Sequence, residues 1–320
     1  MSGQGAPPSE GRGNRLDLLD AARGAALLAM VVYHFTWDLE FFGYVERGTT
    51  GSGGWKLFAR SIASSFLFLA GVSLVLAHGR AIRWRAFGGR FLQVVAGAAI
   101  ITGTTYFATP GGFVFFGILH EIALASFLGL AFVRLRFWLT ALAGFAVIAL
   151  AQVFETPLTN PKWLAWIGMA ERPPVSNDYV PLFPWFGAVL LGIAAARLVS
   201  DRGGWEAIGR AGRRLTRLSP LSWLGRRSLV FYLLHQPILF GLVWAFAQVS
   251  PPDPATILQS ECRRGCISEG READFCAAYC GCIGVKLENA DLLRAFLEGL
   301  TTREEDAEIE GMVLECSMPR

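Results

Sequence analysis

The sequence contains little charge for its length. Of 320 residues, 17% are charged and 53% are hydrophobic, whereas about 25% of the residues in ordinary soluble domains are charged. A soluble core cannot absorb that much apolar surface. The net charge of +3 is too small to indicate a nucleic-acid partner, particularly because the arginines lie beside hydrophobic runs. The composition therefore predicts a protein whose partner is membrane lipid.

Residues 1–14 contain no apolar run and are rich in glycine, serine and proline, so they resemble neither a signal peptide nor a folded element. We expect a disordered cytoplasmic tail there. Residues 15–250 alternate between apolar runs and short clusters of arginine, glycine and proline. They predict an all-α polytopic membrane domain with about seven transmembrane helices. The expected spans are Leu19–Phe42, Ile62–Ala77, Phe91–Ala108, Phe113–Val133, Phe137–Val153, Val180–Val199 and Ser228–Val249.

Arginines accumulate in alternate connections between these spans. Because arginine-rich loops stay in the cytoplasm, we expect the N-terminus inside and, after an odd number of spans, the C-terminus outside. On the outer face, the proline-rich segment from Phe154 to Tyr179 is expected to form an interfacial cap. The expected cytoplasmic arginines are Arg80, Arg83, Arg85 and Arg90 after the second span, Arg134 and Arg136 after the fourth, and Arg202, Arg210, Arg213, Arg214, Arg217, Arg226 and Arg227 after the sixth.

Cysteine is absent from the first 261 residues, and all six cysteines lie within residues 251–320, a charged and amphipathic segment. Two Cys-x-x-x-Cys pairs each place two thiols on one face of a helical turn, so two antiparallel helices could be stapled together. A metal site is the alternative. Because the segment has no histidine and is expected on the oxidising side, disulfides are favoured and no metal is expected. The predicted bridges are Cys262–Cys280, Cys266–Cys276 and Cys282–Cys316.

Within the first span, the ionisable side chains Arg23, His34 and Asp38 are expensive in a bilayer and therefore indicate function. Arg23 and His34 are eleven residues apart, three helical turns plus about 20°, so they share one face at a separation of ~16 Å along the axis. Asp38 lies one turn beyond His34 on the same stripe. The structural alternative is that His34 bonds a neighbouring helix and Arg23 reaches the lipid headgroups.

Two later spans add polar groups. His120 and Glu121 are adjacent in the fourth span and are further catalytic candidates. His235 precedes Pro237 in the seventh span, where the proline frees a backbone carbonyl that only protein or a wet cavity can satisfy. His235 is either a site residue or a helix-packing residue. His78, beside the cytoplasmic arginines, is interpreted as an interfacial residue.

Six segments carry a family resemblance over about residues 15–245. They are Arg15–Gly24, His34–Leu39, Ser65–Ser73, Phe116–His120, Pro181–Gly187 and Ser228–Pro237. Taken in order, they resemble the bacterial proteins related to the catalytic domain of heparan-alpha-glucosaminide N-acetyltransferase. The wider transmembrane acyltransferase superfamily also resembles this chain in the spacing of Arg23 and His34. The resemblance implies a bacterial inner-membrane enzyme that moves an acetyl or short acyl group from cytoplasmic acetyl-CoA to a sugar amine or hydroxyl outside.

The resemblance also implies roles for individual residues. His34 would be the catalytic base or acyl carrier, oriented by Asp38 or by His120. Trp185, inside the fifth matching segment, is a further candidate for the site. Arginines on the cytoplasmic side would bind the phosphates of coenzyme A. Three of the four candidates are explained equally well by the rule that cytoplasmic loops are rich in arginine, and Arg23 is the exception. The candidate arginines are Arg23, Arg83, Arg85 and Arg90.

The chain departs from the family at one position. In the heparan enzyme the proposed active histidine lies in the loop between the first two spans, whereas residues 43–56 contain no histidine. His34 is the nearest imidazole, so the acceptor cannot be assumed to be glucosamine.

Two other functional classes stay open. A proton-coupled transporter would use the same buried histidines and carboxylates as a relay, although we find no inverted repeat of interrupted spans. A membrane scaffold that displays the cysteine-rich domain would leave those groups unexplained. Whether the protein forms a homo-oligomer is also open.

Overall fold

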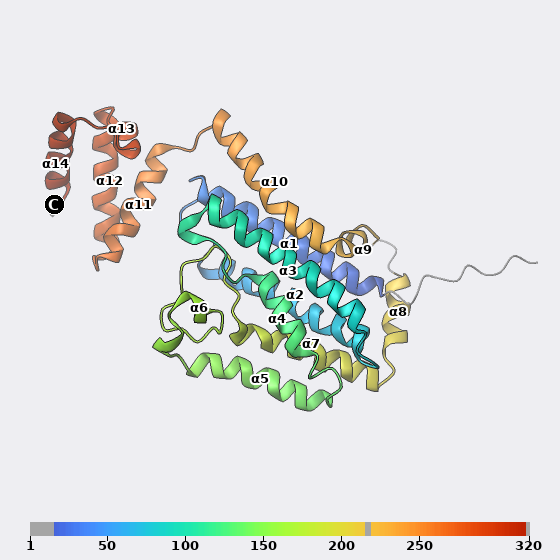
Figure 1. Ribbon diagram of the computed structural model, residues 1–320. Helices are drawn as coiled ribbons and strands as arrows, with labels where there is room; N and C mark the ends of the chain where they lie inside the picture. The colour runs from blue at the N-terminus through green and yellow to red at the C-terminus, as the bar shows by residue number, and fades with distance from the viewer. Residues whose placement is uncertain (1–15, 215–218, 318–320) are drawn as a thin grey trace, which may run out of the picture. The chain divides into compact units, whose positions relative to one another are not determined.

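The computed structural model describes residues 16–214 and 219–317 of the chain. Within these ranges the regular elements are helices, and the one β-type contact is an isolated bridge between Thr156 and Ala170. Figure 1 labels the helices in chain order. The predicted all-helical class is confirmed. The expected tail at residues 1–14, and Arg217 among the cytoplasmic arginines, lie outside the described residues.

Seven apolar helices correspond to the seven expected spans. Of the described helices, five are long and apolar enough to cross a membrane, and two shorter ones are also apolar. The five are α1 (Asp17–Phe41), α2 (Gly53–His78), α3 (Trp84–Ala108), α7 (Leu182–Asp201) and α10 (Ser228–Val249), and the shorter two are α4 (Ile118–Gly129) and α5 (Phe137–Val153). Helices α5 and α10 have the expected bounds, whereas α2 and α3 begin earlier than expected.

The remaining helices are short or lie near the C-terminus. They are α6 (Lys162–Ala165), α8 (Trp205–Arg214), α9 (Ser219–Arg226), α11 (Pro254–Ser268), α12 (Ala273–Asn289), α13 (Leu293–Glu298) and α14 (Arg303–Ser317), with the 3-10 turns η1 (Pro110–Gly112) and η2 (Pro157–Thr159).

Large apolar side chains on the spanning helices point away from the protein. On α5, Leu142 is 63% exposed and Phe145 is 61% exposed. On α10, Leu242 is 63% exposed and Trp244 is 54% exposed. A water-soluble protein rarely exposes contiguous apolar surface of this kind, because each exposed group would order water around it. These faces suit the hydrocarbon of a bilayer, in keeping with a multi-pass membrane fold.

Helix α4 is shorter than the apolar run that contains it. The expected start is Phe113, but residues 113–117 run into the helix without helical turns. They instead bond to the segment before α7: Asn177 donates its N–H to Gly112, and Val180 donates its N–H to Phe116. The N–H groups of Asn177 and Val180 therefore bond to carbonyl oxygens that a longer α4 would have used in its own hydrogen bonds. Asn177 belongs to the segment Phe154–Tyr179, for which an interfacial cap on the outer face stays a prediction.

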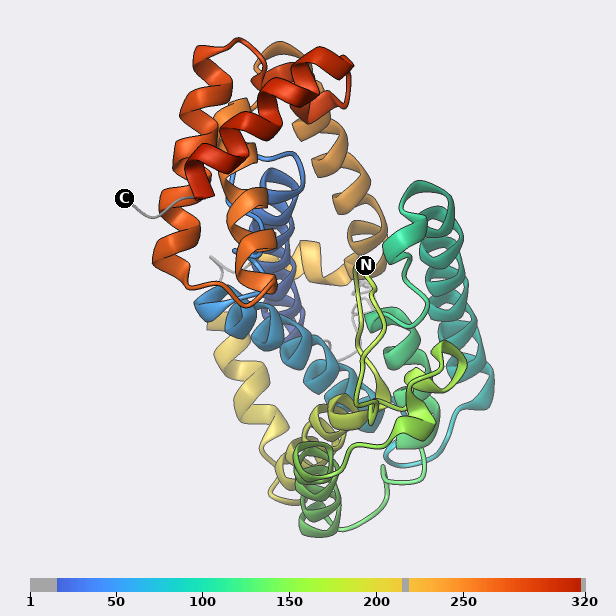
Figure 2. The same ribbon diagram turned by 90° about the vertical axis from the view of Figure 1, so that its left-hand side faces the viewer.

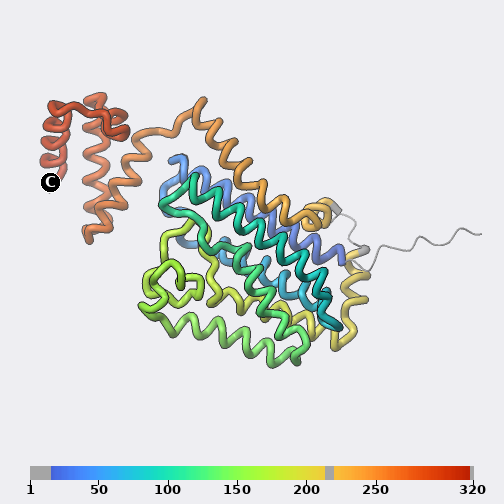
Figure 3. Tube along the Cα trace, in the orientation of Figure 1, coloured from blue at the N-terminus to red at the C-terminus, as the bar shows by residue number. Residues whose placement is uncertain are grey.

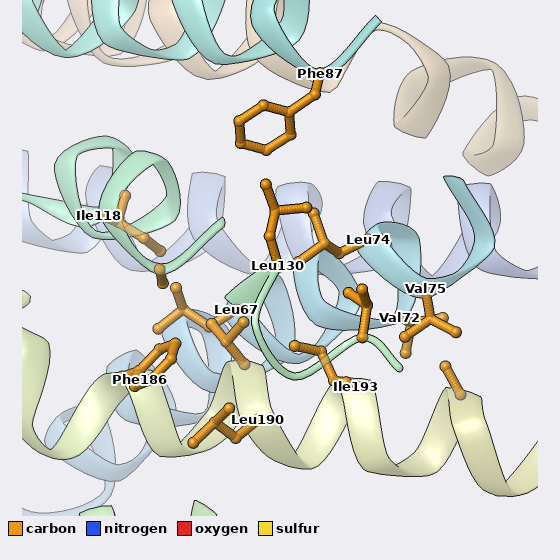
Figure 4. Close-up of a cluster of buried hydrophobic side chains, with 14 of the residues drawn as sticks. Leu67, Val72, Leu74, Val75, Phe87, Ile118, Leu130, Phe186, Leu190 and Ile193 are labelled. Atoms are coloured by element: carbon orange, nitrogen blue, oxygen red, sulfur yellow. The ribbon is translucent and has the colours of Figure 1, made fainter. Parts of the chain in front are cut away.

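The described chain forms two compact units, the first from Met1–Met30 and Arg60–Leu234 and the second from Val31–Ala59 and His235–Arg320. In the first unit, α7 packs against α5 and α4, and α3 packs against α4. Figure 4 shows Leu67 of α2 together with Leu190 and Ile193 of α7 in a cluster of buried hydrophobic side chains.

Glycine permits the closest of these helix contacts. A Cβ on Gly71 of α2 would lie 2.1 Å from the carbonyl oxygen of Val189, and a Cβ on Gly192 of α7 would lie 2.1 Å from the carbonyl oxygen of Phe68. The two helices thus meet backbone to backbone, as small residues allow in membrane bundles where no hydrophobic effect drives helices together.

The end of the second unit is a helical domain held by three disulfides, all paired as expected. Its helices α11 to α14 are traced in orange to red in Figures 2 and 3. Bridges Cys262–Cys280 and Cys266–Cys276 join α11 to α12, each with its Cα atoms 5.7 Å apart, and Cys282–Cys316 joins α12 to α14 at 5.8 Å. A small core around Leu258, Leu287 and Ile309 fills the space between the helices.

We predict that replacing Cys266 and Cys276 together by serine lowers the unfolding free energy of this domain by about 2–5 kcal/mol, because so small a core cannot offset the freed chain entropy. Hydrogen–deuterium exchange should show faster exchange in residues 254–317 and unchanged exchange in α7. Mass spectrometry of unreduced wild-type peptides should find no alkylatable thiol. Bound zinc, with thiols that alkylate only after chelation, would contradict the disulfide assignment.

Candidate functional site

The second unit gathers two imidazoles, a carboxyl and an amide from α1 and α10. The rings of His34 and His235 meet edge to face with their centroids 5.0 Å apart. Gln236 donates a hydrogen bond from Nε2 to Oδ1 of Asp38 at 2.7 Å. Asp38 is fully buried and His235 nearly so. These four residues, referred to below as the histidine cluster, are a polar group enclosed by apolar helices.

The contacts of Asp38 differ from the expected ones. A spacing of one turn puts Asp38 on the same stripe of α1 as His34, yet Asp38 accepts its hydrogen bond from Gln236. His34 makes ring contacts with Tyr33 and His235. The second oxygen of Asp38, Oδ2, has no hydrogen-bond partner among the described residues. A buried acceptor left unpaired costs free energy, so Oδ2 is available to a bound molecule or to a nearby N–H.

The first unit holds Arg23, which lies on the same helix as His34 but is bound within its own unit. Its Nη1 donates to Oδ1 of Asp20 at 2.7 Å, and its Nη2 donates to Oγ of Ser73 on α2. Asp20 is 5% exposed. The guanidinium therefore sits at the junction of α1 and α2 with part of its fork already occupied.

Helix α9 packs against the start of α1 through two glycines. A Cβ on Gly24 would lie 2.1 Å from the carbonyl oxygen of Leu221, and a Cβ on Gly225 would lie 1.8 Å from that of Asp20. Ser222 on α9 also donates its hydroxyl to the carbonyl oxygen of Asp17 at 2.8 Å. The close approach holds the first turns of α1, and with them Arg23, in one orientation.

His120 is bonded through both ring nitrogens. Nδ1 accepts from the N–H of Gly117 at 3.2 Å, and Nε2 lies 3.2 Å from Oγ1 of Thr102. Thr102 gives its own hydroxyl hydrogen to the carbonyl oxygen of Val114, so the assigned network places the imidazole proton on Nε2. The ring therefore ties the start of α4 to α3.

Glu121 is fully buried in α4, and neither carboxyl oxygen has a hydrogen-bond partner among the described residues. His120 and Glu121 are adjacent in sequence, but consecutive helical residues point about 100° apart. They do not form a hydrogen-bonded pair in the structure as described.

The other expected site residues lie in the first unit. Arg83 donates from Nε to the carbonyl oxygen of Ala77, and Arg85 is exposed. Arg90 lines a mostly apolar cavity of about 70 Å³ between α1, α2, α3, α4 and α10. Trp185 packs against the apolar core at the start of α7. Within residues 16–214 and 219–317, no three His, Cys, Asp or Glu side chains are grouped so that they could hold a metal ion.

Asp178 is a residue that the sequence pattern does not single out. Its Oδ2 accepts from the N–H of Ile118 at 2.9 Å, and its carboxyl also bonds the hydroxyl of Tyr232 on α10. A Cβ on Gly117 would lie 2.3 Å from this oxygen. Burial raises the pKa of Asp178 to about 6, although both hydrogen bonds act to lower it. The only sequence signal is its position directly before Tyr179 and the proline-rich start of α7.

A comparison with protein families finds a family described as "Heparan-alpha-glucosaminide N-acetyltransferase, catalytic", whose model matches residues 15–237 of the chain. No curated protein and no solved structure matches.

We predict that Asp178→Asn flattens the dependence of stability on pH. Because the folded-state pKa of Asp178 lies above its ordinary value, its contribution to stability is fully present below about pH 4 and is lost as the pH rises through about 6. Thermal unfolding in detergent from pH 4 to 7 should therefore show a smaller decline for Asp178→Asn than for the wild type. Parallel curves for the two proteins would show that Asp178 titrates as it does in water.

Proposed function

The chain belongs to the heparan-alpha-glucosaminide N-acetyltransferase catalytic family, and we propose that it transfers an acetyl or short acyl group from cytoplasmic acyl-CoA to a sugar amine or hydroxyl outside. The match covers α1 to α9 and the first half of α10. It ends before α11, so residues 15–250 are proposed as the acyltransferase domain and residues 251–320 as an added extracytoplasmic domain.

The observation that carries this proposal is the histidine cluster. Acyl transfer from a thioester needs a base for the acceptor or a nucleophile that holds the acyl group, and imidazole serves either role near neutral pH. His34 and His235 are the two imidazoles that meet in the second unit. A buried imidazole, His235, in contact with the half-buried His34 and close to the buried carboxyl of Asp38 is costly in a membrane protein, which supports a functional role.

In the direct route, His34 takes the proton of the acceptor amine or hydroxyl. The acceptor atom bonds to the thioester carbonyl carbon, the carbon–sulfur bond breaks, and the thiolate of coenzyme A receives the proton. In the covalent route, His34 bonds the acyl carbon while the carbon–sulfur bond breaks and the thiolate of coenzyme A leaves. The acceptor then bonds the acyl carbon, the bond to the imidazole breaks, and the acceptor's proton passes through the imidazole to the thiolate. Both routes form an imidazolium or acyl-imidazolium that a carboxylate stabilises. Asp38 is the proposed carboxylate. The alternative partner for orienting His34 is His120, but both ring nitrogens of His120 are already hydrogen-bonded.

Arginines on the cytoplasmic side are proposed to bind the phosphates of the donor. Arg85 and Arg90 are exposed, and a guanidinium matches phosphate with two parallel hydrogen bonds. Arg23 is proposed to join them, as the arginine of α1 on the face that also carries His34. The alternating arginine loops support a cytoplasmic N-terminus, a C-terminus outside and a bacterial inner-membrane location.

A proton-coupled transporter is the second candidate, and Glu121 is the observation that favours it. A fully buried carboxyl with no hydrogen-bond partner in residues 16–214 and 219–317 is the kind of group that proton relays use. A scaffold without activity would need neither Glu121 nor the histidine cluster. Transfer of label from acetyl-CoA to a sugar by the purified protein separates the enzyme from both alternatives.

We predict that His34→Ala abolishes transfer of label from [14C]acetyl-CoA to sugar acceptors while expression and donor binding stay unchanged. The loss should be at least about 10²-fold, the scale of general-base catalysis. His235→Ala is the neighbouring comparison, and a milder loss would assign it a supporting role. Near wild-type turnover by His34→Ala would refute the mechanism and move attention to His120 and Glu121.

We predict that Arg23→Ala weakens donor binding first, seen as a raised KM or Kd for acetyl-CoA, because the guanidinium meets phosphate and not the reacting carbon. Since the change also leaves the buried Asp20 without its ion pair, thermal stability must be measured in parallel. Ser73→Ala is the matched control, as it removes one contact of the same guanidinium and keeps the charge. A lowered kcat at unchanged donor KM in Arg23→Ala would contradict the phosphate role.

A further inference from the structure

The cysteine-rich domain contacts the loop between α1 and α2, and both belong to the second unit. Arg47 in this loop forms an ion pair with Glu261 of α11, with Nε and Oε1 2.7 Å apart. Gly43 has a φ of +86°, and a Cβ there would lie 3.0 Å from Cγ1 of Ile257, also on α11. Tyr44 donates its hydroxyl to the carbonyl oxygen of Ser250. Helix α11 is therefore packed onto residues 43–47.

The same loop is anchored to α1 by one carboxylate. Glu40 accepts from the N–H of Gly48 at 2.6 Å, from the N–H of Thr50 at 2.8 Å and from the hydroxyl of Thr50 at 2.6 Å. Thr50 is 3% exposed. Three bonds to the carboxylate of Glu40 give the loop a fixed shape rather than the freedom of an ordinary surface loop.

The loop in turn reaches the histidine cluster. Tyr33 donates a long hydrogen bond of 3.5 Å to the carbonyl oxygen of Thr50. Its ring meets that of His34 edge to face with centroids 5.6 Å apart, and it also contacts Trp55. A continuous series of contacts thus runs from Glu261 through the loop and Tyr33 to His34.

We propose that the cysteine-rich domain is a working part of the acyl-transfer site. Helix α11 holds the loop of residues 43–52 and thereby sets the surroundings of His34 that the acceptor meets, with Arg47 and Glu261 as positioning residues. This rests on the proposed function. The domain lies beyond the family match, which ends at residue 237.

The disulfides explain why α11 can hold the loop. Glu261 directly precedes Cys262, whose bridge to Cys280 joins α11 to α12, so its backbone cannot shift without moving the domain. The ion pair itself contributes little to stability, since the side chains of Arg47 and Glu261 are 47% and 31% exposed. Its loss should therefore leave the protein folded and change the geometry of the loop.

The test uses the full-length protein in lipid nanodiscs with Arg47→Gln, Glu261→Gln and the double variant. Kinetics with [14C]acetyl-CoA and glucosamine as the probe acceptor give separate KM values for donor and acceptor. The rate at which diethyl pyrocarbonate modifies His34, followed by peptide mass spectrometry, reports on this imidazole without any acceptor. Lys286→Gln is the matched control, because Lys286 pairs with Glu315 inside the same domain and does not touch the loop.

Each single variant should raise the glucosamine KM by roughly three- to tenfold with the acetyl-CoA KM unchanged. The double variant should match Glu261→Gln in the glucosamine KM, because the contact between Arg47 and Glu261 is already lost in that variant. Glu261→Gln also removes the ion pair with Arg264 inside α11, so Arg47→Gln is the cleaner of the two single variants. The modification rate of His34 should change in these variants and stay at the wild-type value in Lys286→Gln.

Wild-type KM values and modification rates in both single variants would overturn the proposal, as would an equal effect of Lys286→Gln. If the wild type transfers no label to any sugar, the proposed function fails, and the modification rate of His34 alone then decides the inference. An unchanged rate would refute the coupling, whereas a changed rate would retain it for whatever chemistry His34 performs.

Discussion

A polar side chain inside a membrane-spanning bundle has little water to bond, so it must find its partner within the protein. The described residues follow this constraint in both units. Asp38 takes its hydrogen bond from Gln236, Arg23 is bound to Asp20, and His120 has both nitrogens engaged. Both oxygens of Glu121 and one oxygen of Asp38 are among the buried polar atoms of the described residues that have no hydrogen-bond partner, as are Oε1 of Gln236 and Nε of Arg197. Buried groups of this kind are expensive in a membrane protein and are therefore candidates for contact with a substrate or a proton.

The same constraint shapes the segment before α7. Residues 113–117 are not helical, so their backbone groups need other partners. Ser176 and Val180 bond the carbonyl oxygens of Phe113 and Phe116, and the hydroxyls of Thr102 and Thr105 bond the backbone of Val114. Asp178 gives the first N–H of α4 an acceptor. A single carboxyl thus connects the segment before α7, α4 and Tyr232 of α10. Burial at this meeting point of three elements disfavours the charged form of Asp178 and so raises its pKa.

Outside the apolar helices, covalent bonds replace burial as the source of order. The domain of α11 to α14 has a core of few side chains, and three disulfides tie its helices together. Rigidity of this kind has a use beyond stability. A stapled helix can hold a loop that would otherwise move, and α11 contacts the loop between α1 and α2.

The sequence by itself determined the class of the fold, the seven apolar helices and the three disulfides, because run length, charge and cysteine spacing are local properties of the chain. Helices α5 and α10 have their expected bounds for this reason. The early start of α2 and the late start of α4 were not predicted. For α4 the reason is that Phe116, just before the helix, bonds to Val180, some 60 residues further along the chain. The candidate site divides in the same way. His34 and Asp38 are visible as costly residues in an apolar run, whereas the hydrogen bond of Asp38 to Gln236, the ion pair of Arg23 with Asp20 beside Ser73, and the role of Asp178 depend on which helices pack together. Only the tertiary structure decides that, because distant partners share no spacing rule along the chain.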